Sequence, residues 1–191
     1  MNPMRAAILT LGWTIAGSTV LMAAPTIFIP NPDHTFVRFS YDHWGFSTQQ
    51  SRFNKTSGTV TLDPAVHTGA VDIVIDAKSV DTGSELFNGH IQGADFLDTA
   101  QYPTATFRSN SVKFDGDTPV SITGDLTLKG VTKPVTLTVT SFKHAPNMLK
   151  KDSIGANATA SIKRSEFQMS KYSPMVGEDV TLTIAIEAAV P

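Results

Sequence analysis

Histidines are the residues in this chain whose type could most readily support metal binding or acid–base chemistry. The five histidines lie far apart, without the short spacings of a metal site: His34, His43, His67, His90 and His144. The chain contains no GxSxG, HExxH, GxGxxG or phosphate-binding loop. We therefore predict no catalytic residues and no metal ligands, and we interpret these histidines as hydrogen-bonded structural residues.

The composition excludes several other kinds of function. The chain has 15 Lys and Arg against 17 Asp and Glu, a net charge of −2, so it lacks the basic surface that nucleic acid requires. It has no cysteine, which excludes disulfides, thiol catalysis and Cys-based zinc sites. With 191 residues and 41% hydrophobic residues, it is long and apolar enough for one domain with a sizeable core.

The first 23 residues carry the features of a secretory signal peptide. Arg5 is the only charge, the stretch from Ala6 to Ala23 is apolar, and small residues precede the expected cut after Ala23. We therefore divide the chain into a signal peptide, 1–23, and one domain, 24–191. Export to the periplasm, or secretion, is the predicted localisation. An uncleaved membrane anchor is the alternative.

Apolar and polar side chains alternate most clearly from Ser121 to Val139. Because successive side chains of a strand point to opposite faces, each half of this segment has one apolar face. Gly130 supplies the turn between the halves, and Pro134 stands where the second half begins. The segment predicts a β-hairpin, and similar patterns predict strands at 36–43, 59–63, 71–76, 105–109, 112–114, 154–163 and 180–188.

The fold class predicted from these patterns is all-β. Between Thr82 and Asp98 the alternation stops and apolar residues fall at helical spacing, which predicts one short helix capped by Thr82 or Ser84. About eight or nine antiparallel strands with one helix are typical of a closed barrel or a two-sheet sandwich. The spacing of the strands does not distinguish the two.

Small side chains mark the predicted inward face of the strand at 154–163. Ala156, Ala158 and Ala160 stand there, and Gly124 adds a further gap on another strand. Small residues on an inward face leave volume empty unless large partners fill it. The sequence alone leaves both a hollow and a filled interior open; the candidate partners are Phe39, Tyr41, Phe107 and Phe167.

Five motifs in order resemble the YceI-like polyisoprenoid-binding family, across roughly Asp33 to Glu187. They are Asp33-xxx-Val37-x-Phe39-xxx-His43-x-Gly45-x-Ser47, Ile75-Asp76-xx-Ser79-Val80-Asp81-Thr82 with His90 and Asp95-Phe96, Tyr102-Pro103-xxx-Phe107-x-Ser109, Gly124 to Val135, and Ile162-x-Arg164-Ser165-x-Phe167. The chain departs from the family pattern within 82–98. There, Phe87-Asn88 replaces an Arg-Asp pair and Leu97 replaces a second Phe.

The resemblance implies a lipocalin-like, antiparallel up-and-down β-barrel of about eight strands. It also implies non-catalytic binding, transport or storage of a long-chain isoprenoid or quinone-type lipid in an apolar pocket in the periplasm, with that lipid as ligand and no cofactor. The expected partners include the membrane, in transient contact for lipid exchange, and the chain is expected to be a monomer or homodimer. His43 or Arg164 is expected to meet a polar head. The ligand-binding set is Val37, Phe39, Tyr41, His43, Ile73, Ile75, Phe107, Leu126, Leu128, Leu137, Ala156, Ala158, Ala160, Arg164, Phe167, Leu182 and Ile184.

Two other functions remain open at the level of the sequence. One is a structural or stress-related interaction protein with a filled β core. The other is a hydrolase or isomerase that acts on a lipid in the same barrel, with His43 and a nearby acid as its chemical groups. A close-packed interior would favour the first function, and a carboxylate beside His43 would favour the second.

Overall fold

The computed structural model describes residues 24–191, and the expected signal peptide at 1–23 lies outside this part of the chain. Eleven strands, one α-helix and three short 3₁₀ turns make up the described chain. The strands are β1 (Thr26–Pro30), β2 (Phe36–His43), β3 (Ser47–Phe53), β4 (Thr56–Asp63), β5 (Thr68–Asp76), β6 (Val80–Asp81), β7 (Thr104–Asp115), β8 (Thr118–Leu128), β9 (Val131–Pro146), β10 (Asp152–Lys163) and β11 (Val176–Ala189). The helix α1 is Glu85–Gln92, and the 3₁₀ turns are η1 (Pro64–Val66), η2 (Ala77–Ser79) and η3 (Arg164–Phe167).

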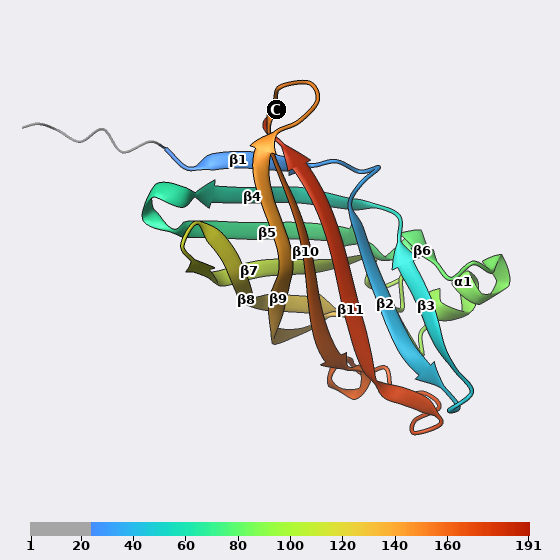
Figure 1. Ribbon diagram of the computed structural model, residues 1–191. Helices are drawn as coiled ribbons and strands as arrows, with labels where there is room; N and C mark the ends of the chain where they lie inside the picture. Colours follow the sequence, from blue (N-terminus) through green and yellow to red (C-terminus); the bar gives the residue numbers. More distant parts are fainter. Residues whose placement is uncertain (1–23) are drawn as a thin grey trace, which may run out of the picture.

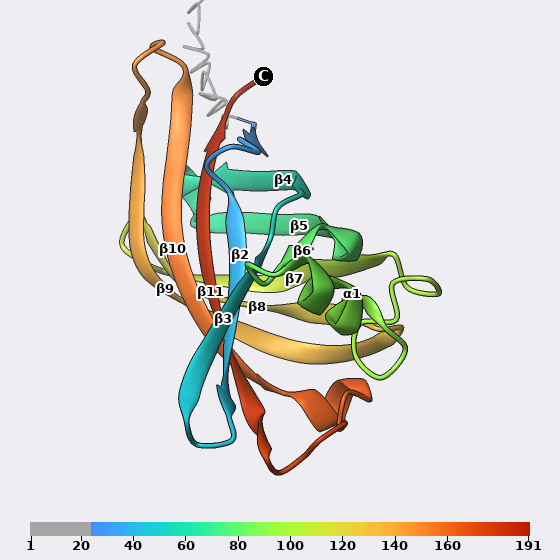
Figure 2. The ribbon, with the colours of Figure 1, turned by 90° about the vertical axis from the view of Figure 1, so that its right-hand side faces the viewer.

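Eight antiparallel strands close into a barrel, as the family resemblance implies, so the sandwich that the strand spacing left open is not the fold. The order around the ring is β1-β4-β5-β7-β8-β9-β10-β11, and β1 pairs with the end of β11 to complete it. In Figure 1 the strands from β4 to β8 run across the direction of β9, β10 and β11. The single helix, α1, lies at one side of the barrel (Figure 2).

The hairpin of β2 and β3 stands beside this ring and widens one end of it. β11 pairs with β1 only at its last residues, and along most of its length it pairs with β2 instead. β3 then continues the sheet from β2 to the short β6. Most side chains of β3 are polar and exposed, so this strand forms because its backbone pairs with β2, although its sequence lacks an apolar face.

Local sequence determines the two features that shape the interior. The turn between β8 and β9 places Lys129 and Gly130 at positive φ, 50° and 74°, which joins the strands in the tight hairpin predicted there. α1 begins at Ser84, whose hydroxyl accepts a hydrogen bond from the Phe87 amide. Gly124 leaves no gap: a Cβ there would lie 2.7 Å from the Phe107 ring, which already occupies the space.

Two clusters of buried side chains divide the core along the barrel. The smaller one surrounds Phe28 near the end where β1 pairs with β11. The larger one contains Tyr41, Phe53 and Phe107, and includes residues of α1 and of the loop that precedes β11. The larger cluster lines most of the outer cavity described next, and residues of both clusters line the inner one.

Candidate functional site

The barrel contains two cavities that meet in its interior. The outer cavity has a volume of about 240 Å³ and the inner one about 130 Å³. Val37, Ile75, Leu126 and Leu182 line both, so the two cavities lie next to each other. An interior filled by its own side chains would have few voids larger than a water molecule. The hollow interior is therefore the one that this sequence adopts.

Alternate residues of β2 form one wall of the outer cavity. Val37, Phe39, Tyr41 and His43 all line it, and Val37 also lines the inner cavity. Because alternate side chains of a strand share a face, the four residues follow the cavity from the interior outwards. His43 and Trp44, at the end of β2, mark its outer end, which we call the mouth.

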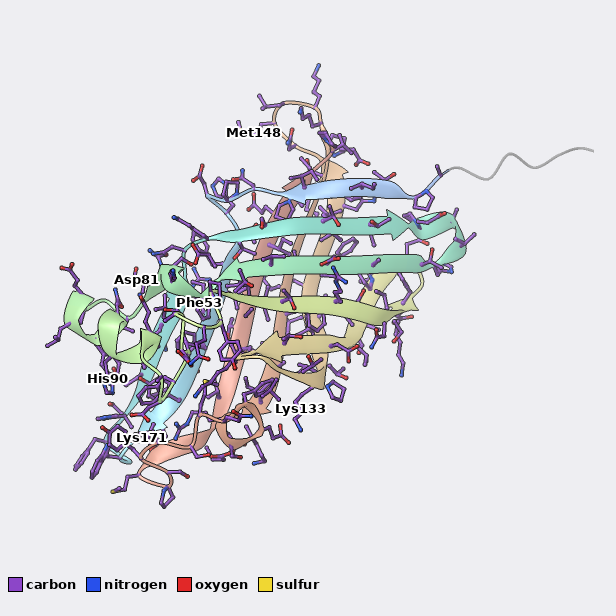
Figure 3. All side chains as sticks on the ribbon, turned by 180° about the vertical axis from the view of Figure 1, so that it is seen from behind. Phe53, Asp81, His90, Lys133, Met148 and Lys171 are labelled. Carbon is purple, nitrogen blue, oxygen red and sulfur yellow. The ribbon has the colours of Figure 1, made fainter. Side chains whose placement is uncertain are left out.

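Aromatic rings from two distant segments surround the mouth. The ring of His90 on α1 lies 5.0 Å from Phe96, 5.6 Å from Phe87 and 6.4 Å from Tyr172, measured between centroids. Tyr172 belongs to the loop at 168–175, between η3 and β11. In Figure 3 the labelled residues His90 and Lys171 lie at the same end of the molecule. The mouth is therefore built from α1 and this loop, together with the end of β2.

Arg164 holds the 168–175 loop in place. Its Nε donates to the Gly177 carbonyl at 2.8 Å, Nη2 donates to Val176 at 2.8 Å, and Nη1 donates to Met169 at 2.6 Å and Lys171 at 3.2 Å. The side chain is buried, and four carbonyl dipoles surround its charge. Most of its donors are thus committed to the backbone, although the side chain also lines the outer cavity.

Tyr41 is a largely buried residue near this guanidinium. Burial raises the pKa of Tyr41, and the nearby charge of Arg164 opposes that rise. Burial also lowers the pKa of Arg164, while Glu178 and Tyr41 raise it. Within residues 24–191 the Tyr41 hydroxyl has no side-chain or backbone hydrogen-bond partner, so it remains able to bond a group inside the cavity.

Lys129 connects the two segments that form the mouth. Its Nζ donates to the Ala94 carbonyl at 2.7 Å and to the Gln168 carbonyl at 2.9 Å. The first carbonyl follows α1 and the second begins the 168–175 loop. The tight turn at Lys129 and Gly130 therefore also fixes the spacing between the two sides of the mouth.

The residues within 24–191 that line the inner cavity are almost all apolar. Among the residues that line it, Thr61 has the only polar side chain within 24–191. Ala156 and Ala158 of β10 line it at positions where larger residues would fill it. Ile154 and Ile186 close this end together with Leu62.

Nearly all of the residues predicted to bind a ligand line one of these cavities. The exceptions are Ala160 and Phe167, which line neither cavity. Phe167 is fully buried in η3 and packs within the larger core cluster, and Ala160 packs against that cluster. The others are Val37, Phe39, Tyr41, His43, Ile73, Ile75, Phe107, Leu126, Leu128, Leu137, Ala156, Ala158, Arg164, Leu182 and Ile184.

Much of the mouth consists of residues that were not predicted from the sequence. Phe87 and Leu97, two of the departures from the family pattern, both line the outer cavity. The helical spacing within 82–98 was the only sequence signal for this wall. The other residues missed in the outer cavity are Trp44, Phe53, His90, Ile91, Phe96, Ala105, Ile162, Met169, Tyr172, Val176 and Val180.

The site contains no evident acid–base pair or metal centre among the residues described. The ion pairs of histidine within 24–191 are His67 with Asp117 and His144 with Asp152, and neither pair includes His43. The same residues contain no group of three or more potential metal ligands. No helix in this part of the chain is long and apolar enough to span a bilayer.

Fold and site together define a class of protein: a closed antiparallel β-barrel whose apolar interior opens through an aromatic mouth. The YceI-like domain profile matches residues 29–188. Protein YceI of Escherichia coli O17:K52:H18 is 39% identical over 175 residues, which cover 90% of this chain and 89% of that protein. A UPF0312 protein of Ectopseudomonas mendocina is 34% identical over 182 residues, or 95% of each chain. The chain belongs to the YceI-like family.

Solved structures share the fold. BcnA of Burkholderia cenocepacia superposes with a TM-score of 0.71 at 27% identity and covers 83% of this chain and 98% of its own. A polyisoprenoid-binding domain from Saccharophagus degradans, implicated in plant cell wall breakdown, gives a TM-score of 0.65 and covers 88% of this chain and 100% of its own. Its identity is 18%, so this second likeness shows the fold alone.

Proposed function

We propose that this protein binds a long-chain apolar lipid, of the isoprenoid or quinone-tail type, inside the barrel. The observation that carries the proposal is the pair of adjoining cavities inside the barrel, of which the inner one is apolar and the outer one reaches the mouth. The structural neighbour from Saccharophagus degradans is itself a polyisoprenoid-binding domain, which supports the same ligand class for this fold.

Hydrophobic transfer alone gives such a lipid useful affinity. Each methylene removed from water contributes about 0.8 kcal/mol, so ten buried carbons contribute about 8 kcal/mol before ordering costs. That corresponds to a dissociation constant of roughly 1 μM. The lipid therefore needs no charged anchor, and a protein with this function needs no catalytic group.

The polar end of the ligand lies towards the mouth. Tyr41, His43 and Arg164 line the outer cavity only, whereas Thr61 has the only polar side chain among the described residues of the inner one. A tail in the inner cavity thus places its head beside the free Tyr41 hydroxyl. Because Arg164 bonds four backbone carbonyls, its main part is to hold the loop and to supply positive potential.

A carrier or sequestering role follows from this site. If residues 1–23 direct export, the protein would hold its lipid in the periplasm or outside the cell, where water separates a lipid from the next membrane. We propose transport or storage there, without catalysis. A lipid hydrolase or isomerase that uses His43 gains no support from the site, because no ion pair within 24–191 provides His43 with an acid.

Ala158→Phe tests the proposal by filling the inner cavity. Ala158 is buried and lines that cavity, so a phenyl ring there should occupy the space of the tail. Organic extraction of the purified variant should yield no long-chain lipid, while the wild type yields one. Ser161→Phe is the matched control, because Ser161 lies exposed on the same strand and should leave the lipid content unchanged.

The experiment has a clear contrary result. If Ala158→Phe folds with a wild-type circular dichroism spectrum and still yields the same lipid in the same amount, the inner cavity does not hold the ligand. The carrier function is wrong if the wild type and Ser161→Phe both yield no lipid and both fail to take up an added polyprenol.

A further inference from the structure

Five exposed apolar side chains lie on the segments that form the mouth of the outer cavity, and two of them, Trp44 and Tyr172, also line that cavity. Phe46 and Leu86 are each 89% exposed, Trp44 is 48% exposed, Met175 45% and Tyr172 44%. We call these five residues the rim. A soluble protein has single exposed apolar residues at many places, but a group around one opening indicates a contact surface.

Contacts in the structure link the segments that carry the rim. The Trp44 amide donates to the Met175 carbonyl at 2.7 Å, which joins the turn after β2 to the 168–175 loop. The ring of Tyr172 lies 6.4 Å from that of His90 on α1. Leu86 stands one helical turn before His90 and therefore on the same face of α1. In Figure 1, α1, the turn between β2 and β3, and the loop before β11 lie on the same side of the barrel, and Figure 2 shows the turn and the loop together at its lower end.

Few free charges lie on these rim segments. Lys171 pairs with Asp95 at 3.3 Å and also lies over the Tyr172 ring at 5.5 Å. Asp42 accepts a hydrogen bond from the Gly45 amide within its own turn. Glu85 in α1 adds one exposed carboxylate. The rim thus lacks the cluster of basic residues that binds anionic lipid headgroups.

We propose that the rim docks on the surface of a lipid bilayer, so that the mouth opens directly into the membrane. This inference rests on the proposed function, because a long-chain lipid insoluble in water can reach the cavity only from a membrane or another carrier. Trp and Tyr favour the interface between headgroups and acyl chains, and Phe46 and Leu86 add apolar area that inserts there. Docking is driven by apolar burial, and it therefore requires neither anionic lipid nor low salt.

The far end of the barrel supplies a matched control. The turn between β9 and β10 exposes Met148 and Leu149 to a similar degree, at 101% and 80%, and Lys150 and Lys151 follow them. Figure 3 shows Met148 at the opposite end of the molecule from His90 and Lys171. If any exposed apolar residues were enough for bilayer binding, this turn would bind the bilayer as well. Docking for lipid exchange would involve the rim alone.

The experiment measures co-sedimentation of the protein with phosphatidylcholine vesicles. Phe46→Ser/Leu86→Ser should weaken the partitioning of the protein to these vesicles by at least about ten-fold, since two apolar side chains no longer insert. Met148→Ser/Leu149→Ser should bind as wild type does. Added phosphatidylserine or raised salt should change wild-type binding little. None of these four residues lines a cavity, so all variants should keep the wild-type melting temperature.

A second readout separates docking from lipid binding. Uptake of solanesol, a polyprenol, from detergent micelles reports on the cavity and should be equal in wild type and Phe46→Ser/Leu86→Ser. If that rim variant sediments with vesicles as wild type does, or if wild type does not sediment at all, docking at the rim is wrong. The same holds if Met148→Ser/Leu149→Ser alone loses binding. If wild type sediments but takes up no solanesol, the proposed function fails while docking stands.

Discussion

The two ends of the barrel are closed by different physical means. At the end where β1 completes the ring, Phe28 is fully buried, its ring meets His144 edge-on at 5.6 Å, and it packs with Val60 and Ile154. At the other end the 168–175 loop crosses near the mouth, and Arg164 holds it by its backbone carbonyls.

This difference explains how one barrel can be sealed at one end and hollow towards the other. Packing by a large side chain stabilises an end but also fills it. Hydrogen bonds to backbone carbonyls fix a loop without placing large side chains in the interior. The mouth can therefore be well ordered and still leave a cavity of about 240 Å³ behind it.

Phe28→Ala should give the largest loss of stability, because it removes the seal at the packed end. Truncation of a buried phenylalanine costs about 3–5 kcal/mol, and urea unfolding should show that decrease in the free energy of unfolding. Phe46→Ala, at an exposed phenylalanine, is the control and should change little. A loss below about 1 kcal/mol for Phe28→Ala would mean that the packed end contributes no more than an ordinary surface residue.

Arg164→Met should have a smaller and more local effect. The substitution keeps an unbranched, largely apolar side chain but removes two hydrogen bonds to the loop and two to the start of β11, which we expect to cost about 2–4 kcal/mol. Hydrogen exchange should accelerate mainly at 168–177. Arg108→Met is the control, because Arg108 forms an exposed ion pair with Asp72. Uniformly faster exchange over the whole barrel would contradict this division between the ends.

Tyr41→Phe should weaken ligand binding without affecting the fold. The phenyl ring keeps the apolar packing, and only the free hydroxyl in the outer cavity is lost. One neutral hydrogen bond contributes about 1 kcal/mol, so affinity for a quinone-headed lipid should fall about five-fold. Tyr102→Phe, outside both cavities, is the control. Equal affinities for wild type and Tyr41→Phe in a fluorescence titration would show that the Tyr41 hydroxyl does not bind the head group.

Glu178→Gln should give the smallest effect, and one that depends on pH. Hydrogen bonding from Ser165 and the charge of Arg164 lower the pKa of Glu178 below its ordinary value of 4.5. The ionised carboxylate therefore stabilises the fold above that value, and this contribution disappears as pH falls through the lowered pKa. Urea unfolding should show wild type slightly more stable than Glu178→Gln at pH 7, with no difference in strong acid. A difference that persists unchanged in acid would contradict this role.

Much of the barrel could be predicted from alternation along the sequence. The patterns around Phe39, Leu126 and Leu182 correctly assigned the faces that line the cavities, because each of these strands has one apolar face. β3 could not be recognised in this way. Its segment, Ser47–Phe53, is polar over most of its length, and it is a strand only because β2 and β6 lie beside it.

The mouth could be predicted only in part, because distant segments form it. His90 and Tyr172 are 82 positions apart in the sequence, and no pattern within either segment predicts that their rings lie close together. Arg164 was assigned to the cavity. Its hydrogen bonds to backbone carbonyls could not be predicted, because they depend on the path of the backbone around it. Phe167, on the same turn, is an apolar aromatic residue of the kind that lines cavities, but it packs in the core instead.

Native mass spectrometry of the purified protein tests the central claim most directly. If the barrel holds one long-chain lipid, the spectrum of the wild type should contain a species heavier than the polypeptide by the mass of a single lipid. That species should disappear after extraction with organic solvent and return when a polyprenol is added. A spectrum that shows only the bare polypeptide, both as purified and after incubation with a polyprenol, would contradict the account.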